Sequence, residues 1–303
     1  MNQLIKAELF KLRKRSMSVV LLLILIAISI LFMTIVQATI RNENSSAATT
    51  SNFNPDSNPT TITQTTPIIT HEDHSTINLL EKINPATMII INNFGVLLAV
   101  ILVASSFGSE YSWQTIRPYL LCCESRSKMF TAKLIAAGIY IVAGMLVAVA
   151  TTAVMGVIFT AIRGYSWDIS FVTMSYVGNG LLTFIRSFYL LLPYVLAAFF
   201  FTVFARDANA GIGFSIGILS LEAIISALLS QISGWVSHIP DYLFNLNVQT
   251  ISNLADSSAK VTINGSGPSS LPTPLHAFIV LSIYIVAFIA IPYYIFQKRD
   301  VTV

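Results

Sequence analysis

Long apolar blocks alternate with polar segments along the whole chain. The first block, 17–38, contains no charged residue, and a helix needs about 20 apolar residues to cross the hydrocarbon core of a bilayer. Five further blocks reach that length, at 86–107, 134–160, 181–204, 210–230 and 276–296. The pattern predicts an all-α integral membrane protein with six transmembrane helices, built as a single membrane domain over residues 1–303.

Two of the polar segments are much longer than the others. Residues 41–85 are rich in Thr, Ser, Asn and Pro, and they contain too little apolar material to form a core. Residues 231–275 begin with an aromatic and aliphatic stretch, Trp235 to Leu246, and then turn to Gly, Ser and Pro. We expect both to be long outer loops, the first mobile and the second starting with an interfacial helix.

Positive charges are divided unevenly between the two sides that six spans define. With both termini in the cytoplasm, 12 of the 17 basic residues lie inside: Lys6, Lys11, Arg13, Lys14, Arg15, Arg117, Arg126, Lys128, Lys133, Arg206, Lys298 and Arg299. The other 5 are Arg41, Lys82, Arg163, Lys260 and Arg186, the last near the outer end of the fourth span. Cytoplasmic loops carry an excess of Lys and Arg, so this bias predicts cytoplasmic termini.

Composition agrees with a membrane domain. Charged residues make up 10% of the chain and the mean hydropathy is +0.73, whereas soluble domains have about 25% charged residues. A net charge of +3 gives no support to nucleic-acid binding. The alternative that block 17–38 is a cleaved signal peptide is disfavoured, because its apolar run exceeds the ~7 to 15 residues of a signal sequence.

Small residues recur at four-residue intervals on two of the predicted spans. They are Gly144, Ala148, Thr152 and Gly156 on the third span and Gly213 and Gly217 on the fifth. Such a face lets another helix approach closely, so we expect both faces to pack against protein. The alternative is that Gly and Ala are simply common in membrane helices.

Two charged residues lie within predicted spans, where an ionisable side chain is costly and usually paired. At 1.5 Å per residue, Arg186 lies ~8 Å and Glu222 ~12 Å from the outer ends of their helices. We therefore expect Arg186 and Glu222 to form an intramembrane charge pair. Such a pair could contact substrate or gate the outer side, or it could only fix helix register.

The chain lacks the signatures of the commonest membrane enzymes. No G-x-x-x-x-G-K-[ST] loop is present and no His-Glu-x-x-His occurs, so the sequence offers no phosphate-binding loop of that kind and no zincin site. The cluster His71-Glu72-Asp73-His74 is better interpreted as a solvated polar run than as a metal site. We expect no catalytic residue, no metal and no cofactor on this chain.

The loop after the second span is the most specific segment. It reads Gly108-Ser109-Glu110-Tyr111-Ser112-Trp113-Gln114-Thr115-Ile116-Arg117-Pro118-Tyr119-Leu120-Leu121, followed by Ser125-Arg126-Ser127-Lys128 and Lys133. With the basic N-terminal segment Lys6 to Arg15 and the six-span layout, it resembles the permease subunits of type-2 ABC exporters. Two departures are Gln114, where that family usually has Gly, and Cys122-Cys123-Glu124, where a Pro commonly precedes Ser-Arg.

The resemblance implies a permease subunit that forms the translocation path of an ATP-driven exporter. The N-terminal segment would be an amphipathic elbow helix, and the loop would be a coupling helix docked on a cytosolic P-loop ATPase, which binds the ATP and Mg. The residues for that coupling loop are Glu110, Tyr111, Trp113, Arg117, Arg126 and Lys128. A second permease copy or a homologous permease would complete the assembly in a plasma membrane, by resemblance a bacterial one.

The sequence constrains the export substrate and the alternative functions less than it constrains the fold. Aromatic side chains on the fourth span favour an amphipathic compound such as a peptide, antibiotic or lipid. An ion-coupled secondary transporter would usually show more intramembrane acids and a repeated half. A non-transporting membrane scaffold or sensor would use its outer loop as a receptor surface.

Overall fold

The computed structural model describes residues 2–49, 83–113, 126–163, 173–229, 232, 235–254 and 272–298. Within these ranges the chain is all-helical and contains no strand. The helices are α1 (Asn2–Lys14), α2 (Ser16–Thr49), α3 (Ile83–Ile90), η2 (Ile91–Gly95), α4 (Val96–Ser112), α6 (Arg126–Arg163), α7 (Met174–Ala205), α8 (Ala208–Leu229), η3 (Trp235–Tyr242), α9 (Phe244–Asn253) and α10 (Pro274–Lys298).

The six predicted spans are confirmed as helices. In the described parts of the chain, six helical stretches are long and apolar enough to cross a membrane: Ser16–Thr39, Thr87–Ser112, Ser127–Ile162, Met174–Ala205, Ala208–Leu229 and Pro274–Lys298. Most of these helices extend past the predicted apolar blocks, because polar residues that flank a block can continue the same helix. The protein thus has the build of a multi-pass membrane protein.

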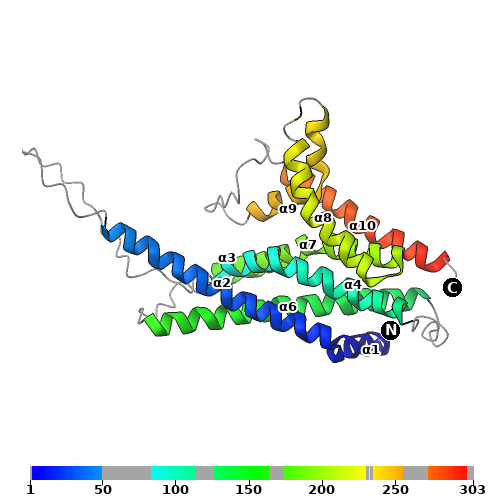
Figure 1. Ribbon diagram of the computed structural model, residues 1–303, viewed down its shortest axis with the longest axis horizontal. Coiled ribbons are helices and arrows are strands. Elements are labelled where there is room, and N and C mark those ends of the chain that lie inside the picture. The colour runs from blue at the N-terminus through cyan, green and yellow to red at the C-terminus, as the bar shows by residue number, and fades with distance from the viewer. Residues whose placement is uncertain are drawn as a thin grey trace, which may run out of the picture.

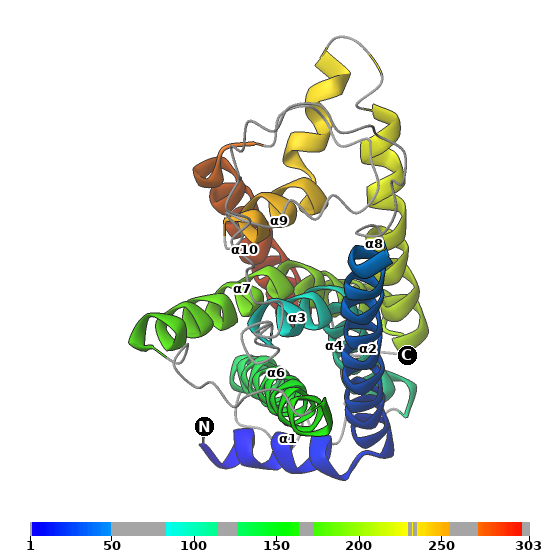
Figure 2. The ribbon, with the colours of Figure 1, turned by 90° about the vertical axis from the view of Figure 1, so that its left-hand side faces the viewer.

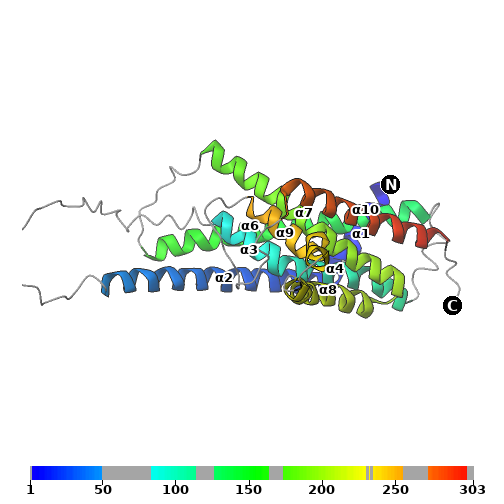
Figure 3. The ribbon, with the colours of Figure 1, turned by 90° about the horizontal axis from the view of Figure 1, so that it is seen from above.

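Helix α7 lies at the centre of the bundle (Figures 1 and 2). It packs against α4, α8 and α10, while α2 and α6 pair with each other on one side. The shared core contains Phe199, which is fully buried and makes edge contacts with Phe107 of α4 and Phe130 of α6. Both ends of the chain lie at the same end of the bundle (Figures 1 and 3), as an even number of spans requires.

Helix α1 runs across the bundle rather than along it (Figure 2). Its last residue is Lys14, and the chain breaks its helical path at Arg15 before α2 begins. Leu12 is buried, whereas Lys6, Lys11 and Lys14 are exposed. This helix therefore has one face on the bundle, chiefly on α6, and one basic face pointing away.

The two long polar segments contain more helix than the sequence indicates. Helix α2 continues to Thr49, so the first outer segment is helical at its start, in contrast to the expectation of a loop from residue 41. The rest of it, 50–82, lies outside the described residues. In the second segment a 3-10 helix, η3, precedes α9, which packs against α10 and α7.

Helices α7 and α8 are joined by a very short turn. Arg206 adopts a left-handed backbone conformation with φ of 56°, and the Asp207 carboxylate accepts a hydrogen bond from Ala210 N at 3.1 Å, which caps the new helix. A side chain on Gly108 of α4 would overlap the backbone of Ala208. Glycine is required there because α4 touches the start of α8 directly.

Candidate functional site

Four charged side chains meet where α1, the end of α4 and the start of α6 come together. Lys133 of α6 lies 3.2 Å from Glu8 Oε2 and 2.5 Å from Glu110 Oε1. Lys11 closes the group at 3.3 Å from Glu8 and 3.6 Å from Glu110. We call these residues, Glu8, Lys11, Glu110 and Lys133, the ion network.

The ion network is mostly hidden from its surroundings. The side chains of Glu8, Lys133 and Glu110 are 7%, 8% and 13% exposed, whereas that of Lys11 is 46% exposed. Among the described residues the network contains two acids and two bases, and each buried charge has an opposite partner. Removing Lys133 from this group is expected to cost about 3–5 kcal/mol, because within the network the buried acids Glu8 and Glu110 would then share the half-exposed Lys11 alone.

Arg15 forms a second link at the same end of the bundle. Its Nη1 donates to the Ser105 and Ser106 carbonyl oxygens at 3.1 and 3.2 Å, and its Nη2 donates to the Ser109 hydroxyl. Its guanidinium also lies 5.5 Å from the ring centroid of Trp113, within the range of a cation–π contact. The break between α1 and α2 is thereby fixed to the last turns of α4.

The structure brings together only part of the predicted coupling loop. Glu110 belongs to the ion network, and Trp113, the residue after α4, has 70% of its surface exposed. Tyr111 is half-buried, and Arg126 and Lys128 lie in the first turn of α6. Arg117 lies outside the described residues, so the docking element itself stays a prediction.

Sequence reasoning missed Glu8 and Lys133 as a pair. Glu8 is the only acid on α1, and it lies on the same helical face as Leu12, its i+4 neighbour. An acid on the apolar face of a basic helix is a signal that a buried partner exists. The sequence does not say which of the basic residues that partner is, because Lys133 is 125 residues away.

Glu222 does not form an ion pair with Arg186, contrary to our expectation. Glu222 is buried, and its Oε1 accepts a hydrogen bond from Asn245 N at 2.6 Å. Its Oε2 and the Nη1 atom of Arg186 each lack a hydrogen-bond partner among the described residues. Asn245 is the second residue of α9, and the Leu243 side chain at the cap position makes no capping bond. The carboxylate of α8 therefore caps α9 from another helix.

Arg186 and Glu222 do not pair because they lie at different heights along neighbouring helices. Beside Glu222, the α9 residue Phe244 packs its ring edge against Tyr194 of α7, with 5.5 Å between ring centroids. Arg186 precedes Tyr194 by two turns, or about 12 Å along the helix. Counting depth from the ends of the apolar blocks placed Arg186 and Glu222 too close together.

Helix α9 is held by an aromatic and polar cluster. Phe244 also contacts Tyr284 and Phe288 of α10, with ring centroids 4.4 and 6.0 Å away. The Tyr284 hydroxyl donates to the Tyr242 carbonyl at 3.1 Å. Asn247, fully buried, donates to the carbonyl oxygens of Asp241 and Leu243. This segment is part of the core and not a separate loop.

Three of the four small residues predicted to form a face on α6 lie against other helices. Ala148, Thr152 and Gly156 are buried, and the Thr152 hydroxyl lies 2.7 Å from that of Thr87 on α3. A Cβ on Gly144 would contact Leu25 of α2 at 4.0 Å. In the structure, most of this face of α6 therefore lies against other helices.

The predicted face of α8 contacts no other helix among the described residues. A Cβ on Gly213 or Gly217 would meet no atom within 4 Å. The helix instead packs through Gly211, which touches Thr202 of α7, and through buried Ser215. These two residues are also four apart, so the spacing was right but the face was displaced by two residues.

Fold and composition define a six-span, all-helical membrane protein. Within that class, the chain belongs to the family described as protein of unknown function DUF2705, whose family model matches residues 61–302. The match covers every span after the first, including Glu110, Lys133 and Glu222. A search of curated proteins found no match.

Proposed function

We propose that this chain is the membrane-spanning permease subunit of an ATP-driven exporter of the type-2 ABC class. It would form the translocation path with a second permease copy or a homologous permease. A separate cytosolic P-loop ATPase would bind the ATP and Mg and supply the work. The observation that carries the proposal is the ion network, because it ties together the elements through which such work would enter.

The ion network links the two helices at the ends of one cytoplasmic segment, so a force on that segment would reach both helices. Residues 114–125 connect α4 to α6, and Glu110 and Lys133 flank this segment at a separation of 2.5 Å. A partner that pushed on the segment would move α4 and α6 as one unit rather than pull them apart. Glu8 and Lys11 would extend the same unit to α1.

Helix α1 has the features required of an elbow helix on the inner membrane surface. It crosses the spans (Figure 2), and its exposed face carries Lys6, Arg13 and Lys14. Basic side chains at this position are attracted to anionic lipid headgroups by about 1 kcal/mol each. Because Lys133 holds Glu8, movement of α6 would also reach this helix.

An amphipathic export substrate fits the described spans better than a bare ion. The region around α7 and α10 is aromatic, with Phe200 contacting Phe201, Phe204 and Phe288. Such rings offer apolar area and polarisable faces but few oxygen ligands for an ion. The substrate class under this proposal is therefore a peptide, antibiotic or lipid.

The proposal is tested by isolating the full chain from gently solubilised membranes and identifying bound proteins by mass spectrometry. We expect a stoichiometric P-loop ATPase. Lys133→Met should lower ATP hydrolysis by the isolated complex at least tenfold, whereas Lys6→Gln, which changes an exposed lysine on α1, should leave it unchanged. A folded preparation without any ATPase would overturn the proposal in favour of an ion-coupled transporter or a scaffold.

A further inference from the structure

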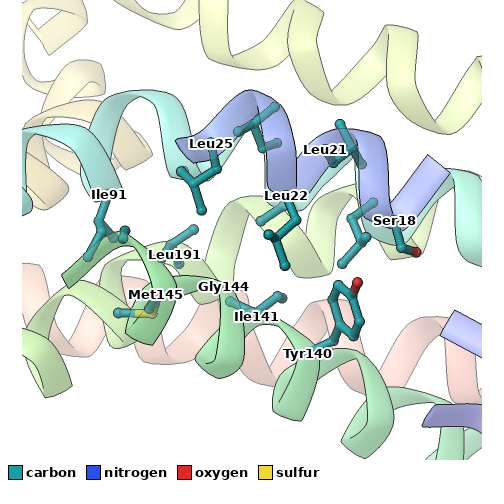
Figure 4. A pocket seen from close by; sticks show the side chains of 15 residues that line it. Ser18, Leu21, Leu22, Leu25, Ile91, Tyr140, Ile141, Gly144, Met145 and Leu191 are labelled. Carbon is teal, nitrogen blue, oxygen red and sulfur yellow. The ribbon is translucent and has the colours of Figure 1, made fainter. Parts of the chain in front are cut away.

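A cavity lies between α2, α4 and α6 (Figure 4). It is lined mainly by apolar side chains and opens to the outside along part of its length. Leu21 and Leu25 of α2 face Ile141 and Met145 of α6 across it, and Leu98 of α4 forms part of the wall. The cavity thus lies between α2 and α6, with α4 beside them.

The lining of this cavity is polar at one end only. Figure 4 shows the hydroxyl groups of Ser18 and Tyr140 at one end and Leu25 and Ile91 at the other. Ser18 follows Arg15 by three residues, and Tyr140 follows Lys133 by seven, or about 10 Å along α6. The polar end therefore points toward α1 and the ion network.

The length and chemistry of the cavity match a hydrocarbon chain. From Tyr140 to Ala148 the cavity follows α6 for about 12 Å, with apolar side chains beyond the first turn. An apolar surface of this kind is covered favourably by an apolar molecule. At membrane depth the surrounding molecules are lipids, and α2 is exposed to them through Leu23 and Leu31.

Basic residues near the polar end indicate the charge of the headgroup. Arg13 and Lys14 are exposed and lie within five residues of Ser18. A phosphate at this surface would meet two cations, while the hydroxyls of Ser18 and Tyr140 could bind the ester region below it. We propose that this cavity binds one acyl chain of an anionic phospholipid whose headgroup lies beside Arg13 and Lys14.

The experiment uses the full chain in vesicles that contain phosphatidylglycerol with a photoactivatable group on its acyl chain. After illumination, cross-linked peptides are mapped by mass spectrometry. We expect cross-links at Leu22 and Met145 that excess unlabelled phosphatidylglycerol removes at least fivefold and phosphatidylcholine removes far less. Cross-links at exposed Val157 should not show this preference, because bulk lipid contacts that face.

Two variants of one helix separate the cavity from general lipid contact. Gly144→Leu should place its side chain in the cavity and reduce the cross-links at Leu22 and Met145 at least tenfold. Gly138→Leu changes a residue whose Cβ would meet no atom within 4 Å, and it should leave them unchanged. Thermal unfolding shows whether each variant is folded. If Gly144→Leu is not folded, the lipid competition on the wild-type chain still tests the inference.

Three results would overturn the inference. The first is labelling confined to exposed faces such as Val157, and the second is equal competition by phosphatidylcholine. The third is a cross-link between two copies of the chain from a photoreactive amino acid at Leu22, which would assign the cavity to a partner helix. Absence of a bound ATPase would count against the proposed function but not against the lipid site, because ATPase binding and lipid cross-linking are measured independently.

Discussion

At the scale of single residues, the ion network should behave as a coupled unit. We expect Lys133→Met to destabilise the protein by about 3–5 kcal/mol, because it leaves the two buried acids, Glu8 and Glu110, with Lys11 as the one base of the network. Glu8→Gln should destabilise it less, because Lys133 keeps its contact with Glu110. The double variant should be less destabilised than the sum of the two, by more than 0.5 kcal/mol. Thermal unfolding of the detergent-solubilised wild type, the two single variants and the double variant measures these differences, with Lys6→Gln at an exposed position as the control. Strict additivity would show that Glu8 and Lys133 do not interact.

Glu222 should act on α9 and not on Arg186. Glu222→Gln keeps an oxygen that can accept the Asn245 N–H bond, whereas Glu222→Leu removes it at a cost of about 1.5–3 kcal/mol. We expect hydrogen exchange in α9 to rise roughly tenfold or more in the Leu variant, since 1.4 kcal/mol corresponds to a factor of ten, and much less in the Gln variant. Leu221→Ala, at an exposed neighbouring position, is the control. Equal exchange in the Gln and Leu variants would contradict the capping role.

Sequence could predict which residues are charged and inside a span, but not their partners. Glu222 was recognised as an intramembrane acid from its apolar neighbours alone, which is local information. Its partner comes from a segment 23 residues later, for which the sequence pattern predicts an interfacial helix. An error of about two helical turns in the relative depth of Arg186 and Glu222 is enough to suggest Arg186 as the partner instead of Asn245.

At the scale of helices, the crossing of α4 and α8 depends on a single glycine. Gly108→Ala should destabilise the protein by about 1–3 kcal/mol or more, because its methyl group would overlap the Ala208 backbone, which cannot rotate away. Gly138→Ala makes the same change where no atom lies within 4 Å, and helix propensity there favours Ala by about 0.8–1.0 kcal/mol. The two melting temperatures should therefore move in opposite directions, and a similar shift in both would refute this account of the α4–α8 contact.

Helix identity was predictable from sequence because hydropathy within a window is a local property. The packing face was predictable where the small residues form one long series, as from Gly144 to Gly156 on α6. On α8 two overlapping series exist, Gly211 with Ser215 and Gly213 with Gly217, and local pattern does not choose between them. The choice is made by Thr202 of α7, which is tertiary information.

At the scale of the whole molecule, the orientation in the membrane connects fold and function. Both ends of the chain lie at the end of the bundle that carries the ion network (Figures 1 and 3). The charge bias predicts that this end is cytoplasmic. A cytosolic ATPase could reach Glu110 and Lys133 only in that orientation.

Single cysteines test the orientation in a chain whose Cys122 and Cys123 are replaced by Ser. Met174 and Leu275 are 89% and 73% exposed and begin α7 and α10, so Met174→Cys and Leu275→Cys should react with a membrane-impermeant maleimide on intact cells. Lys6→Cys should react only after permeabilisation. Labelling of Lys6→Cys on intact cells would place the ion network outside, where no cytosolic ATPase could act on it, and the permease proposal would fall even though every helix was placed correctly.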